Sequence, residues 1–218
     1  MKYPCLVVDH DDTVVNSTAT VHFPCFLEYL KTFRPEASYT LEEYIIKNFH
    51  PGIVALFRDE LGMDDQQMEQ EQIFWNAYVQ DHIPQAYEGM KELLWRQKEE
   101  GGLICVVSHS FEQNILRDFA KNGLPEPDQV YGWNCPPHQR KPDPFPLRSI
   151  MQTYGLKPEE LLVVDDLKPG YDMAQAAGVP FAAALWGYDI PEIQSVFRKT
   201  CPLCFETVES LAEYLQTE

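Results

Sequence analysis

The sequence has few basic residues for its length. Seventeen Lys and Arg stand against 34 Asp and Glu, which gives a formal net charge of -17. Nucleic acids and anionic membrane surfaces are bound through clusters of positive charge, so this balance argues against both as partners. An anionic ligand would have to be attracted locally, by a bound cation and a few Lys or Arg, because the overall field of the protein repels it.

Long apolar runs are also absent. No uninterrupted apolar stretch approaches the roughly 20 residues that a helix needs to cross a bilayer. The N-terminus shows no basic segment followed by a longer apolar one, which is the pattern of a secretory signal. We therefore expect a cytoplasmic protein that makes no membrane contact.

The six cysteines show no spacing that indicates a disulfide framework. Cys5 and Cys105 lie in apolar, strand-like runs, which is typical of small buried hydrophobic residues. Cys201 and Cys204 form an isolated CxxC without the second pair of ligands that a zinc site requires. We expect structural thiols. With 44% hydrophobic and 23% charged residues, the chain has an ordinary globular composition.

The apolar runs that are present alternate with helical patterns. Residues 5–8, 103–107 and 161–164 are short continuous apolar runs, typical of strands buried on both faces of a sheet. Weaker strand candidates lie at residues 129–132 and 181–185. Amphipathic or glycine-terminated helical patterns are found at residues 89–100, 111–122, 145–154, 172–177 and 210–215. This alternation predicts the α/β class, with a Rossmann-like, mostly parallel sheet covered on both faces.

A helical and acidic segment interrupts this alternation after the first strand. Apolar residues recur at helical spacing between residues 18 and 84, and Thr40 and Glu43 match a capping box at a helix start. A further helix is expected over residues 68–81. We therefore predict a core domain made of residues 1–15 and 86–218, with a helical domain of residues 16–85 inserted into it.

Polar side chains follow each of the three strongest strands at the point where it ends. They are Asp9, Asp11 and Thr13 after the first strand, Ser108 after the second, and Asp165 and Asp166 after the third. Because parallel strands end at the same edge of a sheet, we expect these groups to face one crevice. Lys141, held in a proline-rich loop, could add a fixed positive charge. Such a set suits Mg²⁺ and a phosphoryl group.

In this order the segments resemble the four signatures of the haloacid dehalogenase-like superfamily. The sequence from Asp9 to Thr13 is similar to the DxDxT signature, and Ser108 ends the second strand as the second signature requires. Lys141-Pro-Asp-Pro144 resembles the third signature, and Asp165-Asp166 the fourth. The resemblance runs from the first strand to about Gly178. The inserted helices are similar to the cap of the phosphoglycolate phosphatase and β-phosphoglucomutase branch.

The resemblance implies a role for each matching residue. Asp9 would be the nucleophile, and Asp11 the general acid and base. Mg²⁺ would be held by the carboxylates of Asp9 and Asp166, with help from Asp165, and by the backbone carbonyl of Asp11. The phosphoryl oxygens would be bound by the side chains or backbone of Thr13, Ser108, His109 and Lys141, and Lys141 would also shield Asp9.

These roles imply a Mg²⁺-dependent phosphatase that hydrolyses a small phosphorylated metabolite through an aspartyl-phosphate. Two alternatives stay open. One is a phosphosugar mutase of the β-phosphoglucomutase kind, and the other is a non-catalytic binding or regulatory protein with the same fold. Dehalogenation is disfavoured, because relatives that act on carbon–halogen bonds lack a carboxylate at the position of Asp11. The chain could be a monomer or a homodimer.

Some residues depart from the family pattern or have simpler interpretations. Asp12 stands where the family has Gly, which could alter the backbone path. Ser108 could be a helix N-cap, and Lys141 a solvated surface charge. Asp172 is expected to be an exposed helix residue or to support the site indirectly. In the inserted domain, His50 and Arg58 are weak candidates for substrate selection.

Overall fold

The computed structural model describes residues 1–216 and consists of two compact units. The first unit contains Met1–Asn16 together with the chain from Gln85 onward, and the second contains Ser17–Pro84. The core range expected from the sequence, residues 86–218, includes residues 217 and 218, which lie outside the described residues.

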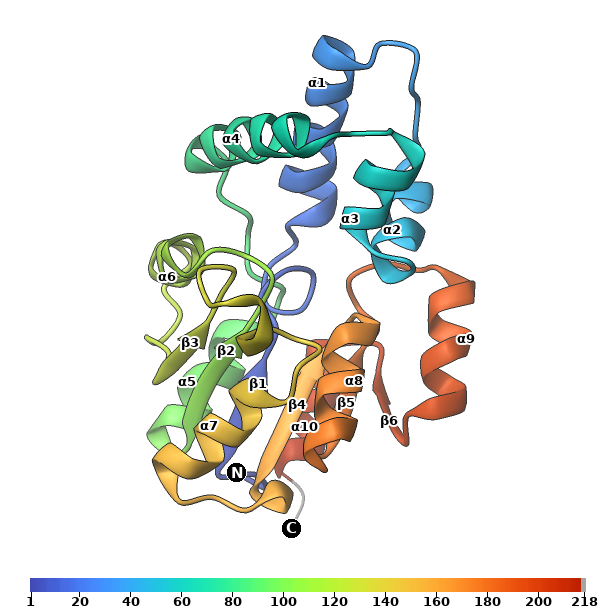
Figure 1. Ribbon diagram of the computed structural model, residues 1–218. Coiled ribbons are helices and arrows are strands. Elements are labelled where there is room, and N and C mark those ends of the chain that lie inside the picture. The colour runs from blue at the N-terminus through green and yellow to red at the C-terminus, as the bar shows by residue number, and fades with distance from the viewer. Residues whose placement is uncertain (217–218) are drawn as a thin grey trace. The chain divides into compact units, whose positions relative to one another are not determined.

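The first unit is built on a parallel sheet with the strand order β3-β2-β1-β4-β5-β6 (Figure 1). The strands are β1 (Cys5–Val8), β2 (Leu103–Val107), β3 (Gln129–Tyr131), β4 (Leu161–Asp165), β5 (Phe181–Ala184) and β6 (Leu203–Phe205). In the register, Val8 pairs with Val106 on one side and Val164 on the other. The prediction of an α/β protein with a Rossmann-like parallel sheet is confirmed.

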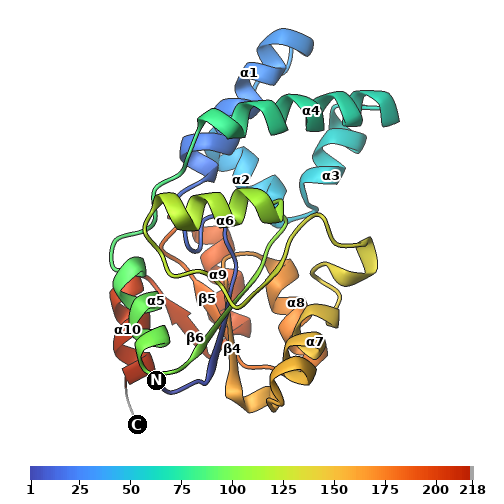
Figure 2. The same cartoon turned by 90° about the vertical axis from the view of Figure 1, so that its left-hand side faces the viewer.

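Helices cover both faces of this sheet, as Figure 2 shows: α5 and α10 lie against one face, and α7 and α8 against the other. The helices of the unit are α5 (Met90–Glu99), α6 (Glu112–Lys121), α7 (Phe145–Tyr154), α8 (Lys168–Ala177), α9 (Pro191–Thr200) and α10 (Val208–Gln216). Leu6, Ile104 and Leu162 are fully buried in the core beneath α5 and α10. Burial on both faces explains the continuous apolar runs of β1, β2 and β4.

Two elements of this unit, α9 and β6, were not predicted. Strand β6 is a three-residue edge strand whose side chains are only half-buried, so it shows no apolar run in the sequence. Helix α9 buries only Ile193 and Phe197, which is a narrow apolar face. Helix α8 begins at Lys168, earlier than expected. Cys204, in β6, and Cys201, two residues before this strand begins, carry free thiols, as do the other four cysteines.

The second unit is helical. It contains α1 (Phe23–Phe33), α2 (Leu41–Phe49), α3 (Ile53–Ala55), α4 (Asp65–Asp81) and two π-helical turns, η1 (Thr18–His22) and η2 (Leu56–Glu60). Its core is rich in aromatic side chains. The predicted capping box is present: Glu43 N donates to Thr40 Oγ1 at 3.2 Å, and Thr40 N donates to Glu43 Oε2 at 2.7 Å. Helix α4 starts earlier than expected because Asp64 caps it.

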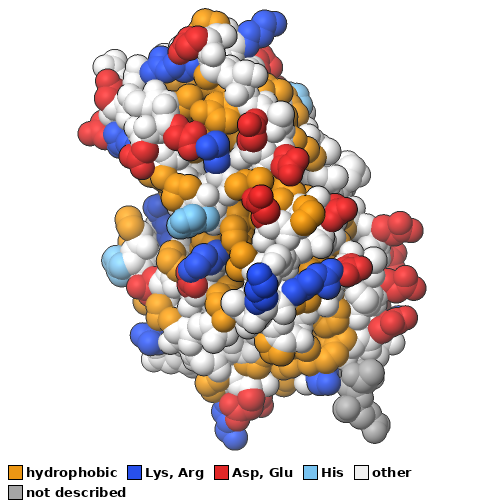
Figure 3. All heavy atoms as spheres, turned by 90° about the vertical axis from the view of Figure 1, so that its right-hand side faces the viewer, with side chains coloured by type: hydrophobic (Ala, Val, Ile, Leu, Met, Phe, Trp, Pro, Cys, Tyr) orange, Lys and Arg blue, Asp and Glu red, His pale blue; other side chains and the backbone are white. Residues whose placement is uncertain are grey.

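The surface of the described residues is mixed in character. Acidic and basic side chains are interspersed with apolar ones on the face shown in Figure 3. The large apolar side chains that are exposed lie on five different helices, which is normal for a protein surface: Leu27, Val54, Ile73, Trp95 and Val196. Among the described helices, none combines the length and apolarity that a membrane span requires.

Glu71 gives the helical unit a pH-sensitive carboxyl group. Burial raises the pKa of Glu71 to about 7, and His22 opposes the shift. Trp75 Nε1 donates to His22 Nδ1 at 3.0 Å, which holds the imidazole in place. The effect of burial on the Glu71 carboxyl group therefore outweighs the contribution of His22.

We expect Glu71→Gln to be more stable than the wild type at pH 8, by on the order of 1–3 kcal/mol in the free energy of unfolding. The folded-state pKa lies above the unfolded value, so protonated Glu71 favours folding and this contribution is lost as the pH rises through 7. The gain should shrink toward pH 5 in urea unfolding experiments. Glu69→Gln, at an exposed position of the same helix, is the control. A gain that does not change with pH would contradict the assignment.

Candidate active site

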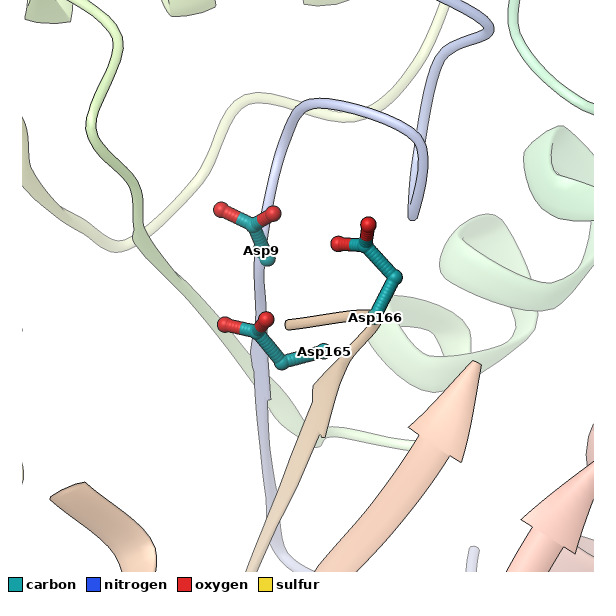
Figure 4. A group of neighbouring side chains, drawn as sticks. All are labelled: Asp9, Asp165 and Asp166. Atoms are coloured by element: carbon teal, nitrogen blue, oxygen red, sulfur yellow. The ribbon is translucent and has the colours of Figure 1, made fainter. Parts of the chain in front are cut away.

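Three buried carboxyl groups meet at the carboxyl edge of the sheet. Asp9 follows β1, Asp165 ends β4, and Asp166 comes next in the chain. Their side chains point into the space between the ends of the two strands (Figure 4). One oxygen of each lies within 4.8 Å of one oxygen of each of the others. The pairing of β1 with β4 creates this group, because Asp9 N still donates to Val164 O at 2.9 Å.

Asp9, Asp165 and Asp166 form an acidic group, and Lys141 is the cation paired with it. Its Nζ lies 2.7 Å from Asp9 Oδ1 and 2.7 Å from Asp165 Oδ2. Burial lowers the pKa of Lys141, but the charges of Asp165 and Asp9 outweigh it and the pKa is raised. The side chain is therefore charged and almost fully buried, so the interpretation of Lys141 as a solvated surface charge is wrong.

His109 holds the loop that carries Lys141. Its Nε2 donates to the backbone oxygen of Lys141 at 2.9 Å, and its ring meets Trp133 edge-on. Loss of solvation around the imidazole, and then the charge of Lys141, lower the pKa of His109, although part of the residue is exposed. The ring of His109, a residue predicted to bind phosphate, thus anchors the Lys141 loop through Nε2.

The acidic group carries more negative charge than Lys141 can neutralise. Burial raises the pKa of Asp165 to about 7; Lys141 opposes this shift and Asp9 adds to it. Burial, Asp9 and Asp165 together raise the pKa of Asp166 well above its usual range. Three buried carboxylates against one ammonium form a donor set that suits a hard divalent cation. The residues present therefore fit a metal ion such as Mg²⁺.

The backbone fixes the Asp165 carboxylate toward Lys141. Leu167 N donates to Asp165 Oδ1 at 2.8 Å, while Oδ2 accepts from Lys141. Helix α8 approaches so closely that a Cβ at Gly170 would lie 2.1 Å from Asp165 Oδ2. A glycine is therefore required at position 170.

Asp11 faces two serines that follow β2. Ser110 Oγ donates to Asp11 Oδ2 at 2.6 Å, and Ser108 Oγ lies 3.5 Å from the same oxygen. Ser108 Oγ also accepts from Ser110 N at 3.1 Å. Helix α6 has Phe111 at its N-cap, so the interpretation of Ser108 as the N-cap is wrong. The carboxylate of Asp11 is not part of the acidic group of Asp9, Asp165 and Asp166.

Asp12 has a left-handed backbone, with φ 55°, in the turn that follows β1. Asp is one of the residues that tolerate this conformation best after Gly, which explains how it can stand where the family has Gly. The side chain of Asp12 is buried.

Asp166 is held by two hydroxyl groups. Thr13 Oγ1 donates to Asp166 Oδ1 at 3.2 Å, and the Tyr188 hydroxyl donates to Asp166 Oδ2 at 2.8 Å. Thr13, predicted to bind phosphate, thus contacts an acidic side chain. Tyr188 and Ser110 were missed in the sequence. Ser110 lies two positions after Ser108, and Tyr188 follows the expected strand at residues 181–185. The signal in the sequence that could have indicated both residues is their position just after the end of a strand.

The remaining candidates lie outside the acidic group. Asp172 pairs with Lys168 on the exposed side of α8, as expected. In the helical unit, Arg58 pairs with Asp65 and donates to Met63 O at 3.3 Å, so it braces the start of α4, and His50 is exposed. His10 is buried beside Asp9, and its Nε2 lies 3.0 Å from Asp118 Oδ2.

Comparison with known proteins assigns the chain to a family. A family profile described as haloacid dehalogenase-like hydrolase matches residues 6–184, which span β1 to β5. The chain belongs to the haloacid dehalogenase-like hydrolases. The resemblance found in the four sequence segments is thereby confirmed, and the polar ends of β1, β2 and β4 fall within the matched range.

Individual relatives of this haloacid dehalogenase-like hydrolase are named as phosphatases. It is 31% identical over 198 residues to a phosphoglycolate phosphatase of Pseudomonas savastanoi pv. phaseolicola, covering 86% of this chain and 72% of that protein. It is 26% identical over 190 residues to the pyrophosphatase PpaX of Bacillus cereus, covering 85% of each chain. A haloacid dehalogenase-like protein of Bacteroides fragilis has the same fold, with a TM-score of 0.81 at 22% identity, over 96% of this chain and 100% of that one.

Proposed function

We propose that this hydrolase is a Mg²⁺-dependent phosphatase that cleaves a small phosphorylated metabolite through an aspartyl-phosphate on Asp9. The observation that supports this most directly is the meeting of Asp9, Asp165 and Asp166 with buried Lys141 at one edge of the sheet. The phosphatase names of the relatives support the same reaction class.

The carboxylates of Asp9, Asp165 and Asp166 would hold the metal ion, together with the backbone carbonyl of Asp11. When bound, Mg²⁺ would supply positive charge to the phosphoryl oxygens. It would also offset the excess negative charge that the raised pKa values of Asp165 and Asp166 reflect.

The reaction that we propose has two steps. A carboxylate oxygen of Asp9 attacks phosphorus, the bond from phosphorus to the leaving oxygen breaks, and Asp11 gives that oxygen a proton. Water then attacks the phosphorus of the aspartyl-phosphate and gives a proton to Asp11, while the bond from phosphorus to the Asp9 oxygen breaks. This releases inorganic phosphate and restores both carboxyl groups. Ser110, which donates to Asp11 at 2.6 Å, orients the group that moves the proton.

Lys141 would assist both steps by charge. Its Nζ contacts the Asp9 carboxylate at 2.7 Å, so it reduces the repulsion between Asp9 and an incoming phosphate. Burial excludes water from this ammonium, which strengthens its effect on nearby charge. Ser108, with the backbone of His109, would bind the remaining phosphoryl oxygens.

The helical unit would act as the cap that selects the substrate. The chain leaves the core unit directly after the turn that contains Asp11 and returns beside it, since Asn16 N donates to Gln85 O at 2.9 Å. This insertion point, only a few residues from Asp9 in the sequence, supports a cap role. A cap that closes over the site favours small substrates over polymers.

We expect dialysis against EDTA to lower phosphate release about 10³-fold, and added Mg²⁺ to restore it. Metal charge stabilisation amounts to several kcal/mol, and each 1.36 kcal/mol is a factor of ten in rate. The assay would measure phosphate release across a panel of phosphorylated metabolites, with phosphoglycolate and pyrophosphate first because relatives carry those names. A physiological substrate should approach the median turnover of enzymes, about 10 s⁻¹.

The same panel distinguishes the alternatives. A mutase would convert glucose 1-phosphate into its isomer without releasing phosphate, and a non-catalytic protein would release phosphate from no substrate. Undiminished hydrolysis in EDTA would contradict the metal dependence, and an inactive panel with Mg²⁺ present would overturn the proposed function.

A further inference from the structure

The segment that follows β5 contacts both the turn after β1 and the Asp166 carboxylate at the end of β4. Trp186 Nε1 donates to Thr13 O at 3.0 Å, in the turn after β1. A Cβ at Gly187 would lie 2.8 Å from Asp12 O, so the two backbones are in direct contact there. The next residue, Tyr188, reaches Asp166 at the end of β4. This segment was not singled out in the sequence, and no step of the proposed reaction uses it.

Tyr188 and Thr13 control the orientation of the Asp166 carboxylate. The Tyr188 hydroxyl lies 2.8 Å from Asp166 Oδ2 and 3.1 Å from the backbone oxygen of Asp166, and it has one proton to donate. The shorter contact, to a carboxylate oxygen, is the stronger hydrogen bond. With Thr13 on Oδ1, each oxygen of this carboxylate has a hydroxyl donor.

The neighbouring charges make this control necessary. Asp9 and Asp165 repel a third carboxylate, and rotation about the side-chain bonds of Asp166 would relieve the repulsion by moving its charge away. A tyrosine side chain has only two torsions, so the backbone of its segment largely sets the position of the hydroxyl. Trp186 and Gly187 hold this backbone against the turn after β1. The hydroxyl therefore opposes the rotation from a fixed point.

We propose that Tyr188 is a positioning residue that holds the Asp166 carboxylate where Asp9, Asp165 and Asp166 can share one divalent cation. The inference rests on the proposed function in taking that cation to be Mg²⁺. Groups that orient metal ligands typically change metal affinity 10- to 100-fold when they are removed. The role of Tyr188 is thus to set metal affinity, without touching the substrate.

The test is Tyr188→Phe, which removes the hydroxyl and keeps the ring. Calorimetric titration of the metal-free protein with Mg²⁺ should give a Kd raised about 10- to 100-fold. The Mg²⁺ concentration for half-maximal phosphate release should rise in parallel, whereas KM for the phosphoester at saturating Mg²⁺ should stay within about twofold. The control is Tyr154→Phe, because the Tyr154 hydroxyl donates to Asp128 O at 3.1 Å, outside the acidic group. Its Mg²⁺ Kd should be unchanged.

The outcomes separate this inference from the proposed function. A folded Tyr188→Phe protein with a wild-type Mg²⁺ Kd would overturn the inference alone. An unfolded one would assign Tyr188 a structural role and also overturn it. A wild-type protein that binds Mg²⁺ but hydrolyses no phosphoester would overturn the proposed function, while a raised Kd in the variant would still uphold the inference. A wild-type protein that binds no Mg²⁺ would overturn both.

Discussion

Asp9→Asn is expected to lower phosphate release at least about 10⁴-fold while leaving the fold intact, because an amide cannot attack phosphorus to form the acyl phosphate. Asp9 is buried at the end of β1, with Lys141 Nζ 2.7 Å from its Oδ1, and an asparagine of the same shape can fill its place. Steady-state phosphate release measures the loss of rate, and far-UV circular dichroism measures the fold.

A direct measurement of the intermediate sharpens this prediction. Wild-type protein quenched in acid during turnover should carry the added mass of one phosphoryl group on the peptide that contains Asp9, and the Asp9→Asn protein should not. The matched control is Asp172→Asn, which removes an exposed carboxylate paired with Lys168 and should leave the rate unchanged. Phosphate release by Asp9→Asn within tenfold of the wild type would exclude Asp9 as the nucleophile.

Lys141→Met is expected to lower the free energy of unfolding of the metal-free protein by about 3–5 kcal/mol at pH 8. The change leaves the buried carboxylates of Asp9 and Asp165 without their ammonium partner, and a buried unpaired charge is strongly unfavourable. In the wild type, where Lys141 is present, the pKa of Asp165 is about 7. At pH 8 the Asp165 carboxyl group of the wild type is therefore mostly ionised. Urea unfolding in EDTA provides the measurement.

The control for this variant is Lys168→Met, at an ion pair that is about half exposed. Surface pairs of this kind contribute at most about 1 kcal/mol, so the two variants should differ clearly. Mg²⁺ should stabilise Lys141→Met more than it stabilises the wild type, since the metal supplies the missing positive charge. Similar unfolding midpoints for Lys141→Met and the wild type in EDTA would show that the acidic group does not need Lys141 for stability.

Much of the fold could be predicted because its signals are local. The continuous apolar runs of β1, β2 and β4 indicate strands buried on both faces, and Thr40 with Glu43 marks a helix start within four residues. The edge strand β6 escaped prediction, since three half-buried residues show no such run. Helix α8 begins earlier than expected because Pro169 near its start is compatible with the first helical turn.

The site could be predicted in outline for the same reason. Asp9, Ser108 and Asp165 each stand where an apolar run stops, and parallel strands end at a common edge. That Lys141 is buried against two of these carboxylates has no local signal, because a lysine in a loop is ordinarily solvated. Its burial follows from how the loop packs, with His109 donating to its backbone oxygen.

The amino-acid sequence by itself determined that this chain is an α/β hydrolase with acidic residues at its strand ends and a helical insertion after the first strand. Only the tertiary structure decided which side chains support them: Ser110 at Asp11, and Tyr188 with Thr13 at Asp166. The physical reason is the strand order. Apolar runs indicate individual strands but not their order in the sheet. Strand β5 lies beside β4, which brings Tyr188 to Asp166, and this placement depends on how all the strands pack together.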